Sequence, residues 1–386
     1  MMKTFSIGGI HPSDSKISKD CKIEVLPVPS KVFISVAQHL GAPATPVVKA
    51  GDQVKVGQVI AEPAGFISAY VHSSVSGTVK SVGPRKDLAG NNMTHIEIDV
   101  EGDEWIEGVD LTDTLVTAIP EDNKAILEKI KMCGVVGLGG ATFPAHVKLC
   151  PPPGKKADCL ILNGAECEPY ITSDARTMLD DADYVCEGIR LLQSVAPTVT
   201  KYIIGIEKNK PECIQKISEM TKNDSTVTVK SLPLLYPQGA EKIMVYNTTG
   251  IVIPVGKLPA DAGIVVINVT TLAALAKYVK TGMPLVDRCV TVDGDAVAEP
   301  KNIIVPLGTS ALDVLNFAGG LTQANCKVIM GGPMMGHALY SLSEPVVKTT
   351  NAIIALTEKE SMGKKTTACI HCGRCVSVCP ISLNPT

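Results

Sequence analysis

The first third of the chain contains short runs in which apolar and polar residues alternate, and glycines separate most of these runs. Strand-like runs are predicted at residues 22–26, 54–60, 69–71, 77–82 and 95–100. A period of two that is broken by glycine and proline is typical of small β-strands with one buried face. The pattern therefore predicts an all-β unit over residues 1–120.

From about residue 121 the apolar positions follow helical spacing, and helical segments alternate with strand-like runs. Helices are predicted at residues 122–132, 184–193, 213–220, 239–246 and 272–280, and strands at 159–163, 202–206, 226–232 and 263–268. This alternation predicts a parallel sheet covered on both faces, which we assign to residues 121–282. Ligands of such sheets bind at the carboxyl ends of the strands, where the glycine-rich turn at 134–140 and Asn163 are expected to lie.

A third unit is predicted over residues 283–345. Its elements are strands at 288–292, 301–305 and 327–330 and a helix at 310–317. Thr309 or Ser310 would cap that helix. These elements favour a β-grasp module. Residues 346–386 are expected to hold a linker, 346–368, and the start of a further domain.

Composition narrows the possible functions. The 386 residues are 45% apolar and 19% charged, which is enough to build the cores of several domains. A net charge of −3 and an aromatic content of 4% argue against nucleic-acid binding. The longest apolar window, 263–279, is interrupted by polar residues, so no membrane span is expected. The chain shows no secretory signal, and its thirteen cysteines are therefore expected to be core residues or metal ligands in a reducing setting.

One segment of the first unit is more specific. Residues 48–60, with glycines at positions 51 and 57, and residues 75–79 resemble the barrel-sandwich hybrid of biotinyl and lipoyl carrier domains. A carrier needs a lysine on the hairpin between the two halves, but residues 66–79 contain none. The resemblance therefore predicts the fold without the carrier function.

The strongest motif lies near the end of the chain. Cys369, Cys372, Cys375 and Cys379 have the spacing C-x2-C-x2-C-x3-C and are followed by a proline. Four thiolates at this spacing are typical of bacterial ferredoxins with [4Fe–4S] clusters. A zinc site is the alternative, but zinc ribbons usually separate two cysteine pairs by a longer loop.

This motif also implies a missing counterpart. In two-cluster ferredoxins the first three cysteines bind one cluster and the fourth binds the other. The second cysteine motif that this arrangement requires is not found between Cys379 and Thr386, where the sequence stops. We expect the native protein to continue and to carry two clusters, and this chain to contain an incomplete ferredoxin-like helical tail without an intact cluster. The other nine cysteines lack ligand spacing and are expected to be buried or half-buried.

A second candidate site is rich in glycine. Gly137, Gly139 and Gly140 can expose backbone N–H groups to a phosphate or a flavin ring, and Lys148 supplies a cation. The glycine pattern alone also occurs in plain turns. Three further segments strengthen the prediction of a binding site here, namely 163–169, 236–242 and 268–270.

These motifs together resemble one family over essentially the whole chain. The markers are GGIHP (8–12), GLGGATFP (137–144), NGAECEPYITSDAR (163–176), YPQGAEK (236–242), GGPMMG (331–336) and the cysteine tail. They resemble the RnfC subunit of the Rnf electron-transport complex, a bacterial ferredoxin:NAD⁺ oxidoreductase. The middle domain is also similar to the NADH-oxidising flavoprotein of respiratory complex I, and the third unit to the SLBB-like module of the family.

The resemblance implies a set of site residues. Those expected to bind cofactor are Gly137, Gly139, Gly140, Phe143, Lys148, Asn163, Tyr236, Asn268 and Thr270, with Phe143 stacking on the adenine of the nucleotide. Glu166, Glu168 and Glu241 would line the nicotinamide side as catalytic residues. The chain departs from the complex I pattern at Leu138, Ala165 and Ala240, where that pattern has an arginine, an aspartate and a glutamate, so weaker flavin or NADH affinity or a different pocket geometry is expected.

The implied function is that of a peripheral redox subunit. Such a subunit moves electrons between NAD(H), FMN and [4Fe–4S] clusters on the cytoplasmic face of a bacterial plasma membrane, and partner subunits translocate Na⁺ or H⁺. Ferredoxin or a ferredoxin-like subunit would be a further partner. Two alternatives stay open: a cobalamin reductase of similar layout, and an electron-transfer wire whose flavin pocket has lost catalysis.

Overall fold

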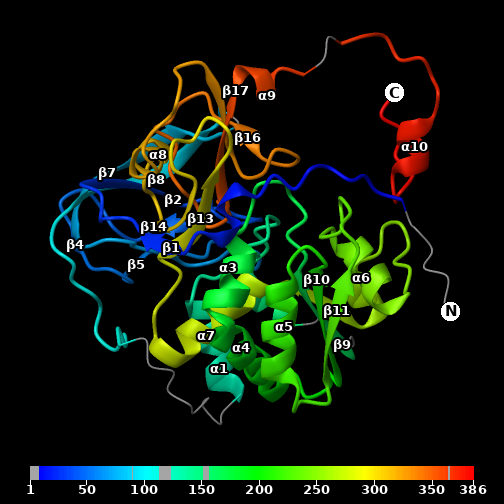
Figure 1. Ribbon diagram of the computed structural model, residues 1–386. Coiled ribbons are helices and arrows are strands. Elements are labelled where there is room, and N and C mark those ends of the chain that lie inside the picture. Colours follow the sequence, from blue (N-terminus) through cyan, green and yellow to red (C-terminus); the bar gives the residue numbers. More distant parts are fainter. Residues whose placement is uncertain (1–7, 89, 113–122, 151–155, 364–365) are drawn as a thin grey trace.

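The computed structural model describes residues 8–88, 90–112, 123–150, 156–363 and 366–386, which form a multidomain α/β protein as predicted (Figure 1). An α/β domain forms one half of the body in this view, and two β-rich units form the other. The predicted domain boundary at 120/121 and the start of the helix at Asp122 lie outside the described residues.

The N-terminal β unit is built from two small sheets. One has the order β2-β8-β7-β4 and the other β3-β5-β6. Their strands are β2 (Lys31–Ser35), β3 (Thr45–Pro46), β4 (Gln53–Val54), β5 (Val59–Glu62), β6 (Val71–His72), β7 (Gly77–Lys86) and β8 (Asn92–Val100). Alternate residues such as Val32 and Ile34 of β2, a strand that was not predicted, are fully buried between the sheets.

The α/β domain has a parallel sheet with the order β11-β10-β9-β12. The strands are β9 (Cys159–Gly164), β10 (Lys201–Glu207), β11 (Val227–Leu232) and β12 (Ile264–Asn268). The helices are α1 (Asn123–Met132), α2 (Ala145–Leu149), α3 (Ser173–Asp180), α4 (Ala182–Val195), α5 (Pro211–Thr221), α6 (Glu241–Thr249) and α7 (Val269–Thr281), with a 3₁₀ turn at Pro259–Ala262. Every strand and helix predicted here is present, and α2 and α3 are additions.

Both faces of this sheet are covered. Leu160 and Leu162 of β9 belong to the core formed with α4 and α7, whereas Ile161 between them packs in the core with Met244 of α6. Figure 1 shows α6 on one side of the sheet and α4, α5 and α7 on the other. This arrangement leaves the carboxyl ends of the strands as the edge where a site can form.

The third unit is a six-stranded mixed sheet with the order β1-β14-β13-β17-β15-β16. Its elements are β1 (Ile23–Val25), β13 (Asp287–Asp293), β14 (Lys301–Pro306), α8 (Ala311–Phe317), β15 (Cys326–Met330), β16 (His337–Ala338), β17 (Ala352–Thr357) and α9 (Glu358–Ser361). Of the two predicted candidates for the cap of α8, Thr309 and Ser310, the structure shows Ser310, whose side chain accepts a hydrogen bond from Asp313 N.

Two expectations about this region are wrong. β1, which was predicted within the N-terminal β unit, pairs in parallel with β14. β17 lies in the expected linker 346–368, yet it forms the centre of the sheet between β13 and β15. Both strands find partners that are far away in sequence, and an apolar run gives no signal of that pairing.

A buried lysine joins the three units. Lys348 Nζ donates to the carbonyl of Tyr70 at 2.6 Å and to that of Gly134 at 2.7 Å. The Lys348 amide donates to the side chain of Gln38. Burial lowers the pKa of this lysine to about 7. Gly134 begins the glycine-rich turn, so this junction helps to fix the turn against the β units.

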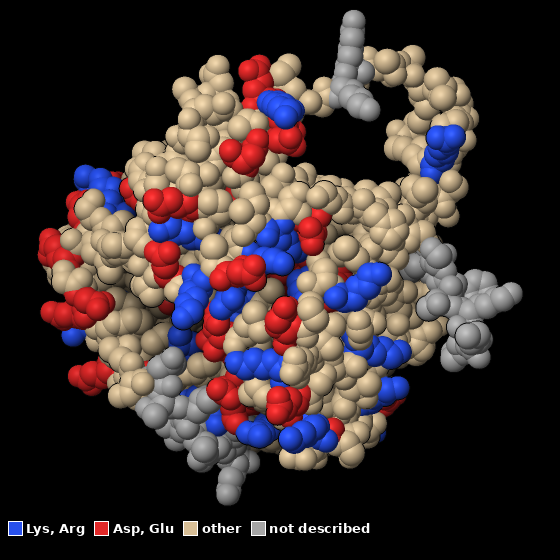
Figure 2. Space-filling view, viewed as in Figure 1, with Lys and Arg blue, Asp and Glu red and all other residues tan. Residues whose placement is uncertain are grey.

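The tail, residues 366–386, contains the short helix α10 (Arg374–Val378) and has no buried residue. On the face shown in Figure 2, basic and acidic side chains are interspersed over the body, and Arg374 is the charged side chain of the tail. Among the helices of the described residues, none is long and apolar enough to span a bilayer.

Candidate functional site

Two asparagines mark the carboxyl edge of the parallel sheet. Asn163 at the end of β9 pairs in register with Asn268 at the end of β12, so the two lie side by side. Asn163 donates from Nδ2 to Gly239 O at 2.9 Å, and its Oδ1 accepts from Ala165 N at 3.1 Å. The YPQGAEK segment is therefore held against the end of β9, as the sequence motifs imply.

The glycine loop, residues 137–143, closes next to these asparagines. Gly137 N donates to Phe143 O at 2.8 Å, and Leu138 N donates to Thr271 Oγ1 at 2.9 Å. A Cβ at position 139 would lie only 3.1–3.2 Å from the side chain of Asn268. Glycine at this position therefore lets the loop approach the end of β12 closely.

A small cavity, with about 30 Å³ open to the centre of a water molecule, lies between the loop and the start of α7. Its lining consists of Gly137, Phe143, Ala145, Lys148, Ile267, Asn268 and Thr271. Four of these were predicted as cofactor-binding residues. This volume is far below the roughly 300–1,000 Å³ typical of small-molecule sites, so the cavity has room for only a small part of a nucleotide.

The start of α7 adds an electrostatic feature to this cavity. Asn268 caps the 13-residue helix by accepting a hydrogen bond from Thr271 N. The aligned peptide dipoles give such a terminus a partial positive charge that favours anions. Asp174 organises the same terminus, because it accepts from Asn268 Nδ2 at 2.7 Å and from Thr270 Oγ1 at 2.6 Å. Thr270 thus faces Asp174, and Asp174 is a site residue that our sequence reasoning did not identify.

Lys148 and Glu241 form an ion pair at this site. Lys148 Nζ lies 2.6 Å from Glu241 Oε1, and the two side chains are 33% and 38% exposed. The pair joins α2 to the start of α6, so a predicted cofactor ligand and a predicted catalytic carboxylate are brought together. Because both groups remain accessible to solvent, an incoming anionic ligand can compete for the lysine.

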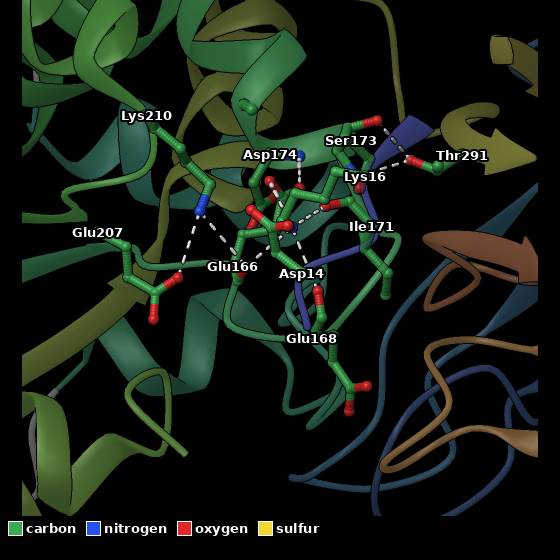
Figure 3. A network of polar contacts seen from close by, with 12 residues as sticks. Asp14, Lys16, Glu166, Glu168, Ile171, Ser173, Asp174, Glu207, Lys210 and Thr291 are labelled. Atoms are coloured by element: carbon green, nitrogen blue, oxygen red, sulfur yellow. Dashed lines mark hydrogen bonds and ion pairs between the residues drawn. The ribbon is translucent and has the colours of Figure 1, made fainter. Parts of the chain in front are cut away.

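The pocket loop, residues 165–171, follows β9 and is held by a buried lysine (Figure 3). Lys16 Nζ donates to the carbonyl oxygens of Glu166 and Glu168 at 3.2 Å each, and also to that of Ile171. Glu166 has a positive φ of 48°, a conformation that is unusual for a residue other than glycine. Three hydrogen bonds from one ammonium group stabilise this backbone.

A second buried lysine holds the loop from the opposite side. Lys210, just before α5, donates to Ala165 O at 2.6 Å and lies 3.4 Å from Glu207 Oε2. Figure 3 shows the two lysines entering the network from different elements. Neither lysine belongs to a recognisable motif, and sequence reasoning missed both.

Glu166 lies inside this network rather than at the surface of the pocket. Its side chain is 3% exposed, its Oε1 accepts from Asp174 N at 2.6 Å, and its Oε2 lies 3.8 Å from Lys16 Nζ. Burial raises the pKa of the Glu166 carboxyl to about 7, although Lys16 and Lys210 act in the opposite direction. Burial also lowers the pKa of Lys16.

Glu168 points away from the lysines and toward the six-stranded sheet unit (Figure 3). Its Oε2 accepts a hydrogen bond from Met334 N at 3.0 Å, in the GGPMMG segment, and a side chain at Gly332 would collide with this carboxylate. Its Oε1 is buried and has no partner among the described residues. Burial raises the pKa of Glu168, and burial together with Glu168 and Cys167 raises that of Tyr236 to about 12.

The three departures from the complex I pattern have different positions. Leu138 is 1% exposed and Ala165 is fully buried, so both pack in the core. Arg288 of β13, which sequence reasoning also missed, is buried and donates from Nη2 to Leu138 O at 3.3 Å. Ala240 is exposed at the start of α6. A buried guanidinium therefore lies beneath the glycine loop although position 138 carries no arginine.

These residues fit an FMN ligand. The glycine loop, the start of α7 and Lys148 suit a phosphate, and the unpartnered Oε1 of Glu168 is a polar atom left for a ligand. Gly139 and Gly140 lie exposed on the loop and Phe143 is half-buried beside it.

The four motif cysteines present the donors of an iron–sulfur site. Cys369, Cys372 and Cys375 are exposed and Cys379 is half-buried. Backbone N–H groups of Leu383 and Ile381 lower the pKa of the Cys379 thiol, which favours the thiolate that binds metal. In the described residues these side chains are not gathered into a group that could hold a metal ion. The donor chemistry of the four thiols fits an iron–sulfur cluster. The nine other cysteines include Cys150, which is exposed and was expected to be buried or half-buried.

Family models match four parts of the chain. The Nuo51 FMN-binding domain matches residues 130–277, the RnfC barrel sandwich hybrid domain 3–103, the SLBB domain 289–338 and the 4Fe–4S binding domain 364–382. Together with the observed architecture they confirm the predicted fold class. Each match falls inside the corresponding predicted domain, and the domain boundaries themselves stay predictions.

Curated relatives match along the whole chain. The C subunit of the proton-translocating ferredoxin:NAD⁺ oxidoreductase complex of Clostridium ljungdahlii is 45% identical, over 100% of this chain and 84% of the relative. The C subunit of the Na⁺-translocating ferredoxin:NAD⁺ oxidoreductase complex of Acetobacterium woodii is 44% identical, over 98% and 85%. The C subunit of the ion-translocating oxidoreductase complex of Rhodobacter capsulatus is 39% identical, over 100% and 74%.

A solved structure shares the fold. An NAD⁺-reducing [NiFe]-hydrogenase in its H₂-reduced state aligns with a TM-score of 0.52 at 21% identity, over 64% of this chain and 50% of that chain. This likeness concerns the fold alone.

Proposed function

Because the chain belongs to the RnfC family, the C subunits of ion-translocating ferredoxin:NAD⁺ oxidoreductase (Rnf) complexes, we propose that it works as the redox subunit of such a complex. The family and its oxidoreductase function agree with the sequence-based prediction, and so do the FMN and iron–sulfur cofactors. The cobalamin-reductase alternative is set aside, since the relatives are subunits of ion-translocating complexes.

One observation carries the proposal. A single chain combines a small cavity, lined by predicted cofactor-binding residues at the carboxyl edge of a parallel sheet, with a ferredoxin-type cysteine motif. A bound FMN supplies a centre that can exchange two electrons with NAD(H) and single electrons with an iron–sulfur cluster. The protein contributes position, electrostatics and exclusion of water.

The residues around the cavity would bind the FMN phosphate and sugar. Backbone N–H groups of Gly139 and Gly140 and of the start of α7 would face the phosphate, while Gly137, whose N–H donates to Phe143 O, would line the cavity beside it. Lys148 would neutralise part of its charge after leaving Glu241. Asn163, Asn268 and Thr270 would position the flavin from the strand ends, and Phe143 and Tyr236 would contact the nucleotide.

The three glutamates would have different roles. Glu168 and Glu241 have polar atoms that can face a nicotinamide, because Glu168 Oε1 has no described partner and Glu241 is partly exposed. Glu166 is bonded to Asp174 N and faces Lys16, and these contacts support a role in holding the pocket loop. We propose that Glu166 acts on the reaction through the loop backbone.

The cysteines would hold the clusters in the ferredoxin-like tail, with Cys369, Cys372 and Cys375 on one cluster and Cys379 on the other. Electrons would reach ferredoxin or a ferredoxin-like subunit, and partner subunits would move the ion. The protein is a subunit of a membrane-associated complex. We place it on the cytoplasmic face, where NADH and ferredoxin are available.

The test is an anaerobic optical experiment on the full protein loaded with FMN and iron. Added NADH should bleach the flavin absorbance and then the iron–sulfur absorbance. Bound FMN that NADH does not bleach would favour the electron-wire alternative. Absence of FMN binding would overturn the proposed function.

A further inference from the structure

A segment near the N-terminus touches three separate parts of the molecule. We call residues 8–20 the strap. It runs from the foot of α10 along the α/β domain and toward the six-stranded sheet (Figure 1). Only its last turn, Ile17–Asp20, is regular, so its path depends on contacts with other elements.

The start of the strap contacts the cysteine tail and the YPQGAEK segment. Gly9 N donates to Val378 O at 2.6 Å. Ile10 and Tyr236 exchange backbone hydrogen bonds of 2.9 and 2.8 Å. Pro380 lies with Gly8 and Tyr236 around a small cavity at this junction. The cysteine motif is thus docked next to the domain that carries the proposed flavin site.

The middle of the strap fixes the pocket loop. Tyr170 N donates to Asp14 O at 2.7 Å, and Lys16 donates to three carbonyl groups of the loop. The far end is anchored in the core, where Ser18 is fully buried and donates from N and Oγ to Asp293 Oδ2 at 2.9 and 2.7 Å. These buried contacts hold the strap independently of its first two residues.

The docking contact depends on glycine. Gly8 has a φ of +91°, and a Cβ there would lie 2.5 Å from Val378 O. Gly9 has a φ of +108°, and a Cβ there would lie 3.0 Å from Tyr236 O. Among the described residues, the bond from Gly9 to Val378 is the hydrogen bond that connects the tail to the rest of the chain.

We propose that the strap positions the iron–sulfur segment against the flavin domain. Gly8 and Gly9 are positioning residues that dock residues 375–380 beside Tyr236, while Lys16 holds the pocket loop from the same segment. The two redox parts are thereby kept at one fixed separation. This inference rests on the proposed function and deepens it.

The experiment compares Gly8→Ala with Gly51→Ala in full-length protein loaded with FMN and iron. Gly51 is a matched control, because its φ is +90° and no atom lies within 4 Å of a Cβ there. Hydrogen exchange of the Gly9 amide and of residues 369–380 is measured together with the rates of flavin and cluster reduction by NADH. A chain that starts at residue 10 serves as a second variant, since it retains Lys16 and Ser18.

In Gly8→Ala, loss of one backbone hydrogen bond should speed exchange of the Gly9 amide about fivefold, and exchange in the tail should also rise. Cluster reduction should slow while flavin bleaching stays unchanged. The chain that starts at residue 10 should likewise show slower cluster reduction and unchanged flavin bleaching. Gly51→Ala should change neither rate.

Equal exchange and equal cluster reduction in Gly8→Ala and Gly51→Ala would overturn the strap proposal, even if NADH bleaches the flavin. If NADH fails to bleach the flavin of the unchanged protein, the proposed function fails instead. In that case the comparison of hydrogen exchange between Gly8→Ala and Gly51→Ala still tests whether the strap docks the tail.

Discussion

The proposed flavin site and the cysteine tail differ in how their structure relates to their sequence signal. The tail carries the most specific motif of the chain, yet none of its described residues is buried and its thiols are not gathered. The flavin site has a weak glycine pattern, yet buried lysines, asparagines and Arg288 hold it in place. The tail thus has the stronger motif and the less organised structure, and the flavin site has the weaker motif and the more organised structure.

Physical chemistry explains the difference. A metal site of closely spaced thiolates can derive its folding energy from the metal, so its own chain needs little core. The described tail exposes large apolar side chains such as Ile370, Ile381 and Leu383. A flavin site positions its ligand through backbone groups and hydrogen bonds, and these require a rigid supporting shell. That shell comes from residues far apart in sequence.

The largest expected effect comes from removing the lysine that holds the pocket loop. Lys16→Met leaves three carbonyl groups and the buried Glu166 carboxylate without their ammonium partner. Breaking a buried pair in this way typically costs about 3–5 kcal/mol. The free energy of unfolding should fall by this amount in denaturant titrations, and FMN binding should weaken.

Lys19→Met is the matched control, because Lys19 is an exposed lysine in the same strap. It should change stability by less than about 0.5 kcal/mol. Similar losses in the two variants would show that Lys16 is not the residue that supports the loop.

The next effect is a dependence of stability on pH. Glu166 has a folded-state pKa of about 7 against an ordinary 4.5. The folded state therefore binds more protons between these values, and the free energy of unfolding should fall as pH rises from 4.5 to 7. The two pKa values limit this contribution to about 3 kcal/mol.

Glu166→Gln should remove that contribution, so the stability difference between the two proteins should change across this pH window. Thermal unfolding at several pH values measures it. A native protein that gains stability relative to Glu166→Gln as pH rises would show that attraction to Lys16 outweighs burial.

A smaller effect is expected in the glycine loop. In Gly139→Ala the new Cβ lies 3.1–3.2 Å from the Asn268 side chain and pushes the loop away from the start of α7. FMN affinity should fall about tenfold, equivalent to about 1.4 kcal/mol, in a flavin fluorescence titration. Gly83→Ala is the control, because no atom lies within 4 Å of a Cβ there. Equal FMN affinities of Gly139→Ala and Gly83→Ala would show that the glycine loop is not part of the proposed site.

The smallest effect on the folded body is expected from the tail. Cys375→Ala should lose the iron of its cluster but change the unfolding of the α/β domain by less than about 0.5 kcal/mol, since the residue is exposed. Cys326→Ala, outside the motif, should retain all iron. Destabilisation of the α/β domain by Cys375→Ala would mean that the tail supports the flavin site.

Sequence patterns predicted local features well. The alternation of strands and helices located the parallel sheet, and the cap of α8 was narrowed to Thr309 or Ser310, of which Ser310 bonds to Asp313 N three residues away. The expected linker failed at β17, whose partners β13 and β15 lie elsewhere in the chain.

In the site, too, sequence patterns identified the residues that lie in motifs but not their partners far away in the sequence. The glycine loop, Asn163 and Asn268 lie in recognisable sequence motifs and come together at the sheet edge. Lys16 is 150 residues from Glu166 in sequence, and Arg288 is 150 residues from Leu138. A single lysine or arginine outside a motif gives no indication of the carbonyl it will meet in the fold.

The most direct test of the contrast between the organised flavin site and the cysteine tail is hydrogen exchange of the full chain with and without reconstituted iron. We expect amides of the pocket loop, residues 165–171, to be equally protected in both states, whereas residues 369–379 should gain protection only with iron. Protection of the pocket loop that appears only after iron is bound would contradict the contrast between the two regions. So would a tail that is equally protected without iron.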